Sequence, residues 1–426
     1  MNLSKKTNRG ITLIALVITI VVLLVIAGVT IAALSGENGI LQRAAEAKEK
    51  TDEAQGRETE TITDYESVID EYSGGGTGTG SGSSSSSSLT DTADTKPASA
   101  MPSGATVVEA NPDNGIVIRD IKNNEWVWIE VPKRTVFKSA TASDQYGNIK
   151  ADLIAYATEY RSSWIDEWYD SEGRIGTERE QSGSGGASIS SNLEDTLGCG
   201  LTYEQYQTTY KKMLTSVYTN GGFWIGRYEA GVSDTTPRTA PGEITGLEAK
   251  SKPDMYPFNF VTCSQAQTLA SAMSTDSNKT SSLMFGIQWD LVCKYLEGKD
   301  GLTKADINSD SKNWGNYSNI AVPITSANAK QRASDGKWST ITVTKPKGSS
   351  VLLSTGASNN TKKMNIYDFA GNEWEWTLEY TSDTNNPCAN RGGYYYSDGS
   401  YYPASYRGNH TTSDSGHYLS FRPSLY

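Results

Sequence analysis

The sequence predicts an α+β head with an unusually high loop content, carried on a long N-terminal helix. Three observations lead to this prediction: an uncharged apolar run near the N-terminus, a Gly/Ser-rich segment further on, and a long C-terminal part in which strand-like and helix-like patterns alternate. The chain of 426 residues then divides into a leader (1–10), an apolar helix (11–34), a helical stalk (35–72), a linker (73–105) and the head (106–426).

The apolar run from Ile11 to Leu34 contains no charged residue and is long enough to cross a membrane. As a helix that rises about 1.5 Å per residue it spans roughly 36 Å, and a bilayer core is about 30 Å thick. Lys5, Lys6 and Arg9 precede the run, and such cations stay in the cytoplasm, so we expect the head to lie outside the cell. A cleaved secretory signal fits less well, because the run is too long and no clear small-residue cleavage site follows it.

The leader and the apolar run together resemble the N-terminal signal of type IV prepilins. A short basic leader ends in Gly10 and passes directly into "ITLIALVITIVVLLVIAGVTI". In that family a prepilin peptidase cuts after the glycine, and the mature helix anchors the protein in the membrane or packs in a pilus core. The resemblance therefore implies cleavage between Gly10 and Ile11, with the peptidase and pilins as partners. Ala15 stands where the family has glutamate at the fifth mature position, which leaves entry into a filament open, and a plain signal anchor is the alternative.

A polar helical stretch and a flexible one separate the apolar run from the head. Residues 35–72 are rich in Ala, Glu, Lys and Gln with a sparse apolar stripe, which is typical of a mostly solvated helix. Residues 73–105 are dominated by Gly, Ser and Thr and cannot bury a core. We expect them to form a tether with a root-mean-square span of roughly 30 Å.

Strand and helix patterns alternate in the head. The stretch "GIVIRDIKNNEWVWIEVPKRTVF" and the stretch Gly221–Val232 alternate in the manner of strands. Cys263–Met273 and Phe285–Gly298 have the apolar spacing of amphipathic helices, and Gly298 ends the second. The aromatic sequence "MNIYDFAGNEWEWTLEY" predicts a further strand after a turn, and the remaining polar sequence predicts long loops.

Charge and cysteine content exclude several classes of protein. The net charge of −11 and the pI near 4.9 argue against nucleic-acid binding, which needs a basic face. The four cysteines are too few and too scattered for a disulfide framework or a metal knuckle. The sequence leaves open whether they are buried thiols or form one or two bridges: Cys199, Cys263, Cys293 and Cys388.

Five motifs of the head occur in the order of a known family: "GGFWIGRYEAG", "IQWDLVCKYLEG", "IYDFAGNEWEWT", "RGGYYY" and "LSFRPSLY". Together they resemble the formylglycine-generating-enzyme-like branch of the C-type lectin fold, over nearly the whole head. Trp374 and Trp376 alternate to one face of a strand, where we expect them to anchor the core. Arg391 and Arg422 are expected to bridge carboxylates or carbonyls.

The chain lacks the groups with which that oxidase works. The enzyme uses two copper-binding cysteines, and at the matching positions stand Ser397 and Tyr402, neither of which is a soft thiolate ligand. The only histidines, His410 and His417, show no triad order. The calcium-and-sugar tripeptides Glu-Pro-Asn and Gln-Pro-Asp of lectins are absent from the sequence. We therefore expect binding without catalysis.

The same resemblance implies a structural calcium ion at the turn before "WEW". Matched residue by residue, Asp368 and Glu375 would supply side-chain ligands, and Gly371 and Glu373 would offer backbone oxygens. Oxygen ligands alone suit Ca²⁺. A turn that ordinary hydrogen bonds hold is the alternative.

The last 36 residues, Arg391–Tyr426, have a composition unlike the rest of the chain. They hold both histidines and eight of the 24 tyrosines, but no Met, Lys, Glu, Gln or Trp. Every residue type present can be encoded by a codon that ends in a pyrimidine, and the five missing types cannot. Randomising asparagine codons at their adenines would produce this pattern. It resembles the variable region (391–426) of target proteins of diversity-generating retroelements, in which an error-prone reverse transcriptase rewrites the end of the gene.

That resemblance implies a C-terminal face that binds an unknown external protein or cell-surface ligand. Tyrosine offers contact area at low entropic cost, and Ser, Gly, Asn and Asp adapt their hydrogen bonds, so we expect the displayed side chains to contribute recognition and little cohesion. A minor pilin or pseudopilin whose head serves assembly is the alternative function, and a tail low in Lys and Glu by chance is the alternative origin. The expected displayed positions are Tyr394, Tyr396, Ser397, Asp398, Tyr401, Tyr402, Tyr406, Gly408, Asn409, His410, Asp414, Gly416 and His417. The expected framework positions are Arg391, Gly392, Gly393, Pro403, Ala404, Phe421, Arg422 and Pro423.

Overall fold

The computed structural model describes residues 88–141, 147–160, 198–233, 235–380 and 385–426. The chain divides into two compact units, Met1–Ser84 and Ser85–Tyr426, and the described residues all belong to the second. The predicted leader, apolar helix and stalk lie outside the described residues. Within the described ranges, no helix is both long and apolar enough to cross a membrane.

The head begins earlier than the sequence predicted, because residues 88–105 of the expected linker belong to the compact unit. The backbone N–H of Lys96 donates to the carbonyl of Asn220 at 2.7 Å, and the indole of Trp128 donates to the Thr95 hydroxyl at 2.8 Å. Ala100 is buried in the core. Few apolar residues make these contacts, so the composition of this stretch is typical of a linker although the stretch is bound to the head.

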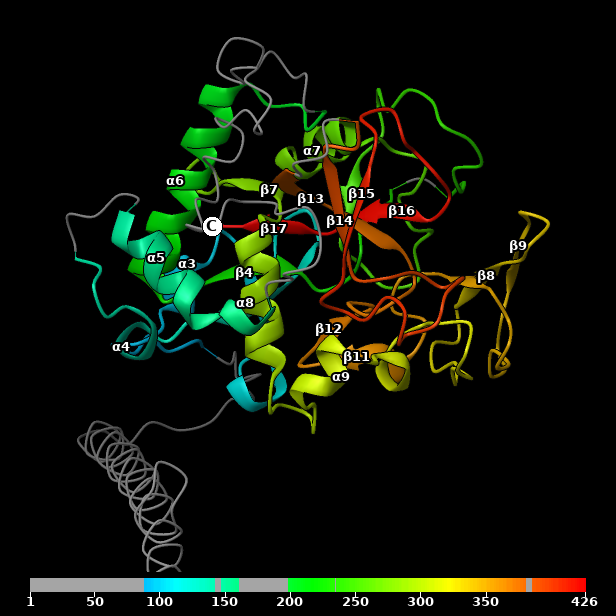
Figure 1. Cartoon of the computed structure of the whole chain (residues 1–426), viewed down its shortest axis with the longest axis horizontal. Helices are drawn as coiled ribbons and strands as arrows, with labels where there is room; N and C mark the ends of the chain where they lie inside the picture. Colours follow the sequence, from blue (N-terminus) through cyan, green and yellow to red (C-terminus); the bar gives the residue numbers. More distant parts are fainter. Residues whose placement is uncertain (1–87, 142–146, 161–197, 234, 381–384) are drawn as a thin grey trace, which may run out of the picture. The chain divides into compact units, whose positions relative to one another are not determined.

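A six-stranded antiparallel sheet forms the centre of the head (Figure 1). The C-terminal strand lies inside this sheet, between strands that come from the middle of the chain, and this position ties the chain's end to the core. The sheet contains the predicted strands around residues 117–130 and 222–226. In spatial order its strands are β1 (Thr106–Glu109), β2 (Val117–Arg119), β3 (Glu125–Glu130), β4 (Gly222–Gly226), β17 (Pro423–Leu425) and β7 (Ser281–Leu283).

A second sheet of four strands carries most of the C-terminal segment, drawn in orange and red in Figure 1. Its strands in spatial order are β15 (Arg407–His410), β14 (Cys388–Arg391), β13 (Trp374–Tyr380) and β16 (Leu419–Phe421). β13 is the predicted aromatic strand, and it pairs in parallel with β16, which leads directly into β17 of the central sheet. The C-terminal segment is therefore attached to both sheets.

Helices cover the central sheet, and two of the larger ones were predicted. α7 (Cys263–Ser271) and α8 (Gly286–Leu296) lie where the apolar spacing placed them, each slightly shorter than expected. α6 (Tyr203–Asn220) was missed and had been assigned to loop. Its apolar positions Tyr206, Tyr210, Met213, Leu214 and Val217 keep a helical spacing, but the polar residues between them hid the pattern. The other α-helices of the described residues are α3 (Pro97–Ala100), α4 (Lys133–Val136), α5 (Gly147–Tyr156) and α9 (Lys304–Asn308).

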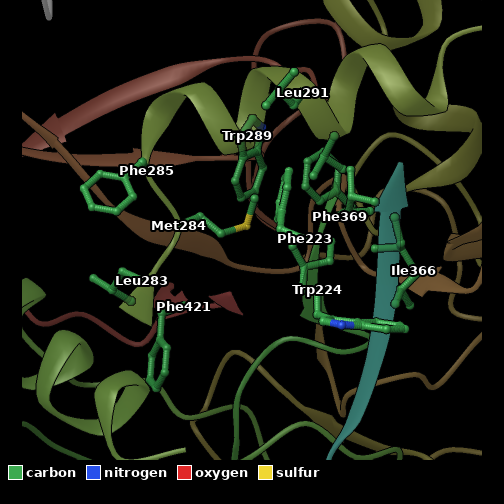
Figure 2. Close-up of a cluster of buried hydrophobic side chains, with 14 of the residues drawn as sticks. Phe223, Trp224, Leu283, Met284, Phe285, Trp289, Leu291, Ile366, Phe369 and Phe421 are labelled. Carbon is green, nitrogen blue, oxygen red and sulfur yellow. The ribbon is translucent and has the colours of Figure 1, made fainter. Parts of the chain in front are cut away.

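The core lies between α8 and the central sheet. Figure 2 shows Trp289 of α8 pointing toward Phe223 of β4, and the Trp289 ring stacks on Phe369 with centroids 4.1 Å apart. Every residue of α8 except Lys294 is buried, so this helix, predicted to be amphipathic, is covered on almost all sides. α8 is thus a fixed support for side chains that come from the C-terminal segment.

Three small sheets complete the head. One pairs β5 (Gly231–Val232) with β6 (Ala249–Lys250), and another pairs β11 (Lys362–Lys363) with β12 (Ile366–Tyr367). The third has the order β10 (Leu352–Leu353), β8 (Lys330–Arg332) and β9 (Trp338–Thr340), and the β8–β9 hairpin extends at the right of Figure 1. The predicted strand Gly221–Val232 is therefore two strands, β4 and β5, which separate at Gly226.

Candidate functional site

The loop that follows "RGG" begins and ends at two buried arginines. Arg391 at the end of β14 stands opposite Arg407 at the start of β15, and both side chains are fully buried. Arg407 donates to both oxygens of Asp290 on α8, at 2.7 and 2.8 Å, and to Glu379 of β13 at 2.8 Å. Arg391 also donates to Asp290, and its other terminal nitrogen donates to the Ser405 carbonyl at 3.0 Å.

These four side chains form a charge-balanced cluster, which we call the arginine clamp: Arg391, Arg407, Asp290 and Glu379. Burial works against ionisation of Glu379, but the two guanidinium groups outweigh it and lower the pKa of that carboxyl group. Two like charges opposite each other in a sheet would repel, so the clamp depends on the carboxylates between them. It holds together the two ends of the loop 392–406.

Two glycines give the loop its direction as it leaves β14. Gly392 and Gly393 have φ angles of +92° and +78°, which residues with a side chain rarely adopt. A Cβ atom on Gly393 would lie 2.3 Å from the Tyr402 carbonyl oxygen. The predicted framework role of both residues therefore has a steric cause.

An aromatic layer covers Trp374 of β13. The ring of Tyr394 stacks on Trp374 at 5.7 Å between centroids, and Tyr402 and Tyr406 meet it at 5.0 and 5.6 Å. Tyr402 and Tyr406 also contact each other edge to face at 4.7 Å. These three tyrosines are half-buried, so they form an inner layer that packs on the core.

Two further tyrosines stand outside this layer. The exposed fraction is 61% for Tyr396 and 73% for Tyr401. Tyr396 stacks loosely on Tyr394 at 6.4 Å, and Tyr401 meets Tyr402 at 5.8 Å. Large side chains so exposed are unusual on a surface without a partner.

The two histidines continue the aromatic surface toward β16. His410 meets the Trp376 ring at 5.6 Å, and its Nδ1 lies 3.1 Å from the carboxylate of Asp414. His417 Nδ1 shares a hydrogen bond of 2.9 Å with the hydroxyl of Tyr395, which is buried. Burial lowers the pKa of both histidines and so favours their neutral form, although Asp414 opposes that effect at His410.

We call this surface the tyrosine face. It consists of Tyr394, Tyr396, Tyr401, Tyr402, Tyr406, His410, His417 and Tyr418, over Trp374 and Trp376. Tyr418 was not predicted, although it is a tyrosine of the same segment and contacts Tyr394 at 5.8 Å. The two tryptophans anchor the core as expected, and they are also the floor of this face.

The structure separates the displayed positions from the framework positions along the tail. No predicted displayed position is buried: Tyr396, Asp398 and Tyr401 are exposed, and Tyr394, Ser397, Tyr402, Tyr406, Gly408, Asn409, His410, Asp414, Gly416 and His417 are half-buried. All the predicted framework residues are buried, namely Arg391, Gly392, Gly393, Pro403, Ala404, Phe421, Arg422 and Pro423. A displayed surface on a rigid scaffold requires this division.

Some positions of the tail differ from the expectation in detail. Gly408 stands opposite Asn390 on β14, and a Cβ atom there would lie 2.3 Å from the Asn390 side-chain oxygen, so a larger residue needs this amide to move. Asn409 is paired with Ala389 and points away from the face that carries Gly408 and His410, because side chains alternate along a strand. Arg407 was assigned to neither group, because it belongs to none of the family motifs, yet its side chain is fully buried.

The four residues predicted to hold calcium do not fit a calcium site. Both oxygens of Glu375 accept hydrogen bonds from Arg422, at 2.6 and 3.1 Å, and both oxygens of Asp368 accept bonds from the protein, at 2.7 and 2.8 Å. Gly371 occupies the turn with a φ of +72°, and its N–H donates to the Gly392 carbonyl. No set of three or more His, Cys, Asp or Glu in the described residues is arranged to hold a metal ion. Ordinary hydrogen bonds and one ion pair hold this turn.

Buried carboxyl groups nevertheless gather behind the turn. Glu229 of the β4–β5 loop accepts bonds from the Glu373 N–H at 3.1 Å and from the Asn372 amide at 2.6 Å. Burial, reinforced by the nearby carboxylates, raises the pKa of Glu229 well above its usual value. Burial also raises the pKa of Glu373 to about 8 and that of Glu375 to about 7. Glu229 and Glu373 therefore bind protons more tightly than they do in the unfolded chain, whereas Arg422 favours the charged form of Glu375.

The positions that match the oxidase's copper ligands are part of the loop surface. The backbone carbonyl of Ser397 accepts bonds from the N–H and the hydroxyl of Ser318, at 2.9 and 3.1 Å, and Tyr402 belongs to the aromatic layer. All four cysteines are buried and none is in a disulfide. Burial raises the pKa of the Cys293 thiol far above its usual value, which makes it a poor nucleophile.

The chain matches no known family model and none of the curated proteins. Among solved structures it is similar to Treponema denticola variable protein 1, with 15% identity and a TM-score of 0.28 over 48% of this chain and 84% of that chain. It is also similar to PvdO from Pseudomonas aeruginosa, with 15% identity and a TM-score of 0.29 over 48% of this chain and 81% of that one. For CarF the identity is 13% and the TM-score 0.28, over 48% and 85% of the two chains. These likenesses are too distant to assign a function.

Proposed function

We propose that this chain is a surface-displayed binding protein with a C-type-lectin-like head, whose tyrosine face recognises external ligands and is diversified by a retroelement. One observation carries the proposal: along the last 36 residues, the side chains expected to vary lie at the surface, and those expected to be constant are buried. The first group was chosen from residue types that can arise from asparagine codons and from the places of the family motifs, without any information on burial. Its agreement with burial therefore supports a replaceable surface on a constant framework.

The mechanism of the proposed function is binding without catalysis. The outer tyrosines Tyr396 and Tyr401 offer exposed rings, and the inner layer on Trp374 holds them above the sheet. Rigid aromatic anchors lose little entropy on binding, and Ser, Asn and Asp between them adapt their hydrogen bonds. The segment 11–34 is proposed to anchor the protein after cleavage at Gly10, with the head outside the cell or on a pilus.

Sequencing the gene's 3′ end in many cells of one culture tests the diversification. Substitutions should fall at adenines of the template and should concentrate on displayed codons such as those of Tyr396, Tyr401 and Asp414. The codons of Gly393 and Arg422 should remain constant. A near-copy rich in asparagine codons, beside a reverse-transcriptase gene, is expected in the neighbouring DNA. Variation spread evenly over framework and displayed codons would contradict the proposal.

Mass spectrometry of the protein purified from its native membrane tests the anchoring. A mature N-terminus at Ile11 is expected, and a G10A variant should stay unprocessed. An intact N-terminus at Met1 in the wild type would contradict prepilin-type processing, but it would leave the binding role of the head unaffected.

A further inference from the structure

Packed rings fill the centre of the tyrosine face. The rings of Tyr402 and Tyr418 lie 6.1 and 5.8 Å from the ring of Tyr394, so they pack around it. The open groove of about 520 Å³ between α6 and α7 shares no residue with the face. A small ligand needs concave walls, so this shape suits a macromolecular partner.

The area of the face also indicates a macromolecular partner. Tyr396 and Tyr401 expose 61% and 73% of their surface. With roughly 200 Å² per side chain, the two rings together offer about 270 Å². A stable protein interface buries roughly 800 Å² on each side, so a partner must also cover the inner layer and the loops around it.

The tail supplies exposed carboxylates to the face but no exposed cation, and the half-buried Arg332 of β8 lies within electrostatic reach of Tyr395 and His417. From Gly392 to Tyr426 the only cations of fixed charge are Arg407 and Arg422, and both are fully buried in ion pairs. Asp398 is exposed, and the Asp414 side chain is 40% exposed. Lys312, whose backbone lies against the Gly399 backbone, forms an ion pair with Asp310.

Each of these two carboxylates keeps one oxygen available. Asp398 accepts a bond from the Ser318 hydroxyl through Oδ1, at 3.1 Å. Asp414 uses Oδ2 for His410 and for the N–H of Thr411, at 3.1 and 3.0 Å. No other described residue donates to Asp398 Oδ2 or to Asp414 Oδ1. These oxygens are placed to accept bonds from a cation that approaches the rings.

We propose that the ligand of this chain's tyrosine face is a protein that presents lysine and arginine side chains around an apolar patch, an inference that rests on the proposed function. The aliphatic stems of such residues lie along aromatic rings, and their charged ends are attracted by ring faces and reach carboxylates. The net charge of −11 opposes a second copy of this chain or an acidic protein as the partner.

Selection from a defined library tests the inference. The probe is a phage-displayed library of one small helical scaffold with unbiased randomised surface positions, selected against the full-length chain in detergent. Binders that Y396A/Y401A abolishes should be enriched in lysine and arginine at least about twofold over the unselected library. Their affinity should fall about fivefold in D398N/D414N, and the difference should shrink at about 0.5 M salt, where exposed charges are screened.

A matched control changes the same charge elsewhere. D113N/E204Q removes two exposed carboxylates on η1 (Pro112–Asn114) and α6, away from the rings, and should leave the affinity within about twofold. The single variant D414N, with the melting temperature recorded, separates lost charge from lost folding.

Two results would overturn the inference in different ways. Face-directed binders with no enrichment in cations and no response to D398N/D414N would refute the chemistry of the partner but leave the proposed function standing. Binders that tolerate Y396A/Y401A would remove the proposed function, and the inference with it.

Discussion

Two pairs of tyrosines on the same loop should behave in opposite ways when truncated. The sequence predicted that all displayed side chains contribute little to cohesion, but the structure divides them into an outer pair, Tyr396 and Tyr401, and an inner pair, Tyr402 and Tyr406. We therefore expect Y396A/Y401A to remove binding and keep the fold, and Y402A/Y406A to weaken the fold itself.

The magnitudes follow from exposure and ring contacts. Each outer ring hides about a third of its surface, roughly 65 Å² of 200 Å². At about 25 cal/mol per Å² this is at most about 1.5 kcal/mol, and the side-chain freedom regained on exposure lowers it below about 1 kcal/mol per ring. The inner pair loses more buried area and its three closest ring contacts, two with Trp374 and one mutual, at about 0.5–1.5 kcal/mol each. Its total loss is about 4–6 kcal/mol.

Calorimetry measures the melting temperature of each variant, and binding to the selected scaffolds measures its affinity. One kcal/mol shifts the melting temperature of a large domain by about 2–4 °C, so the outer variant should melt within about 6 °C of wild type and the inner one at least about 10 °C lower. Loss of two central rings should weaken binding about 30-fold or more. If the outer pair destabilises as much as the inner pair, or the inner pair melts like wild type, the layered arrangement is wrong.

Three further predictions concern the interior. D290N should lower the free energy of unfolding by about 3–5 kcal/mol, because it leaves two buried guanidinium groups without their shared carboxylate. Chemical denaturation measures this loss, and a loss under about 1 kcal/mol would contradict the role of the arginine clamp. Chelating calcium with EDTA should leave the melting temperature unchanged, since Arg422 already occupies the Glu375 oxygens; a rise on adding Ca²⁺ would contradict this. The free energy of unfolding should fall as the pH rises from about 4.5 to about 8. Burial raises the pKa of Glu373 to about 8, so in this window the folded state binds a proton that the unfolded chain has released. A free energy of unfolding that does not change over this window would contradict the prediction.

The family motifs predicted the framework of the tail better than the local patterns predicted secondary structure. Codon type alone does not separate the two groups, because Gly393 shares its codon class with Gly408 and Gly416; the RGG motif marked Gly393 as framework. α6 was missed, since tyrosines and polar residues in its sequence mask the apolar stripe. Arg407 was missed because it belongs to none of the family motifs, and only its burial against Asp290 reveals a structural role.

The calcium prediction rests on nearby ligand types and overlooks a residue that lies far along the chain. Asp368 and Glu375 are close in sequence and suited to an oxygen-ligated ion, but Arg422, 47 residues after Glu375, reaches the Glu375 carboxylate first. The spacing of ligands in the sequence identifies the oxygen donors, but it does not reveal a competing cation from a distant part of the chain.

Residue types and family motifs along the chain told the surface positions from the buried ones among the tail residues that were assigned, but they did not place Tyr395, Arg407 or Tyr418. Only the tertiary structure decided which rings are exposed, which rings pack on Trp374, and which arginine pairs with which carboxylate. Such pairings join strands and helices that are distant along the chain, so their energies depend on distances that no local pattern contains.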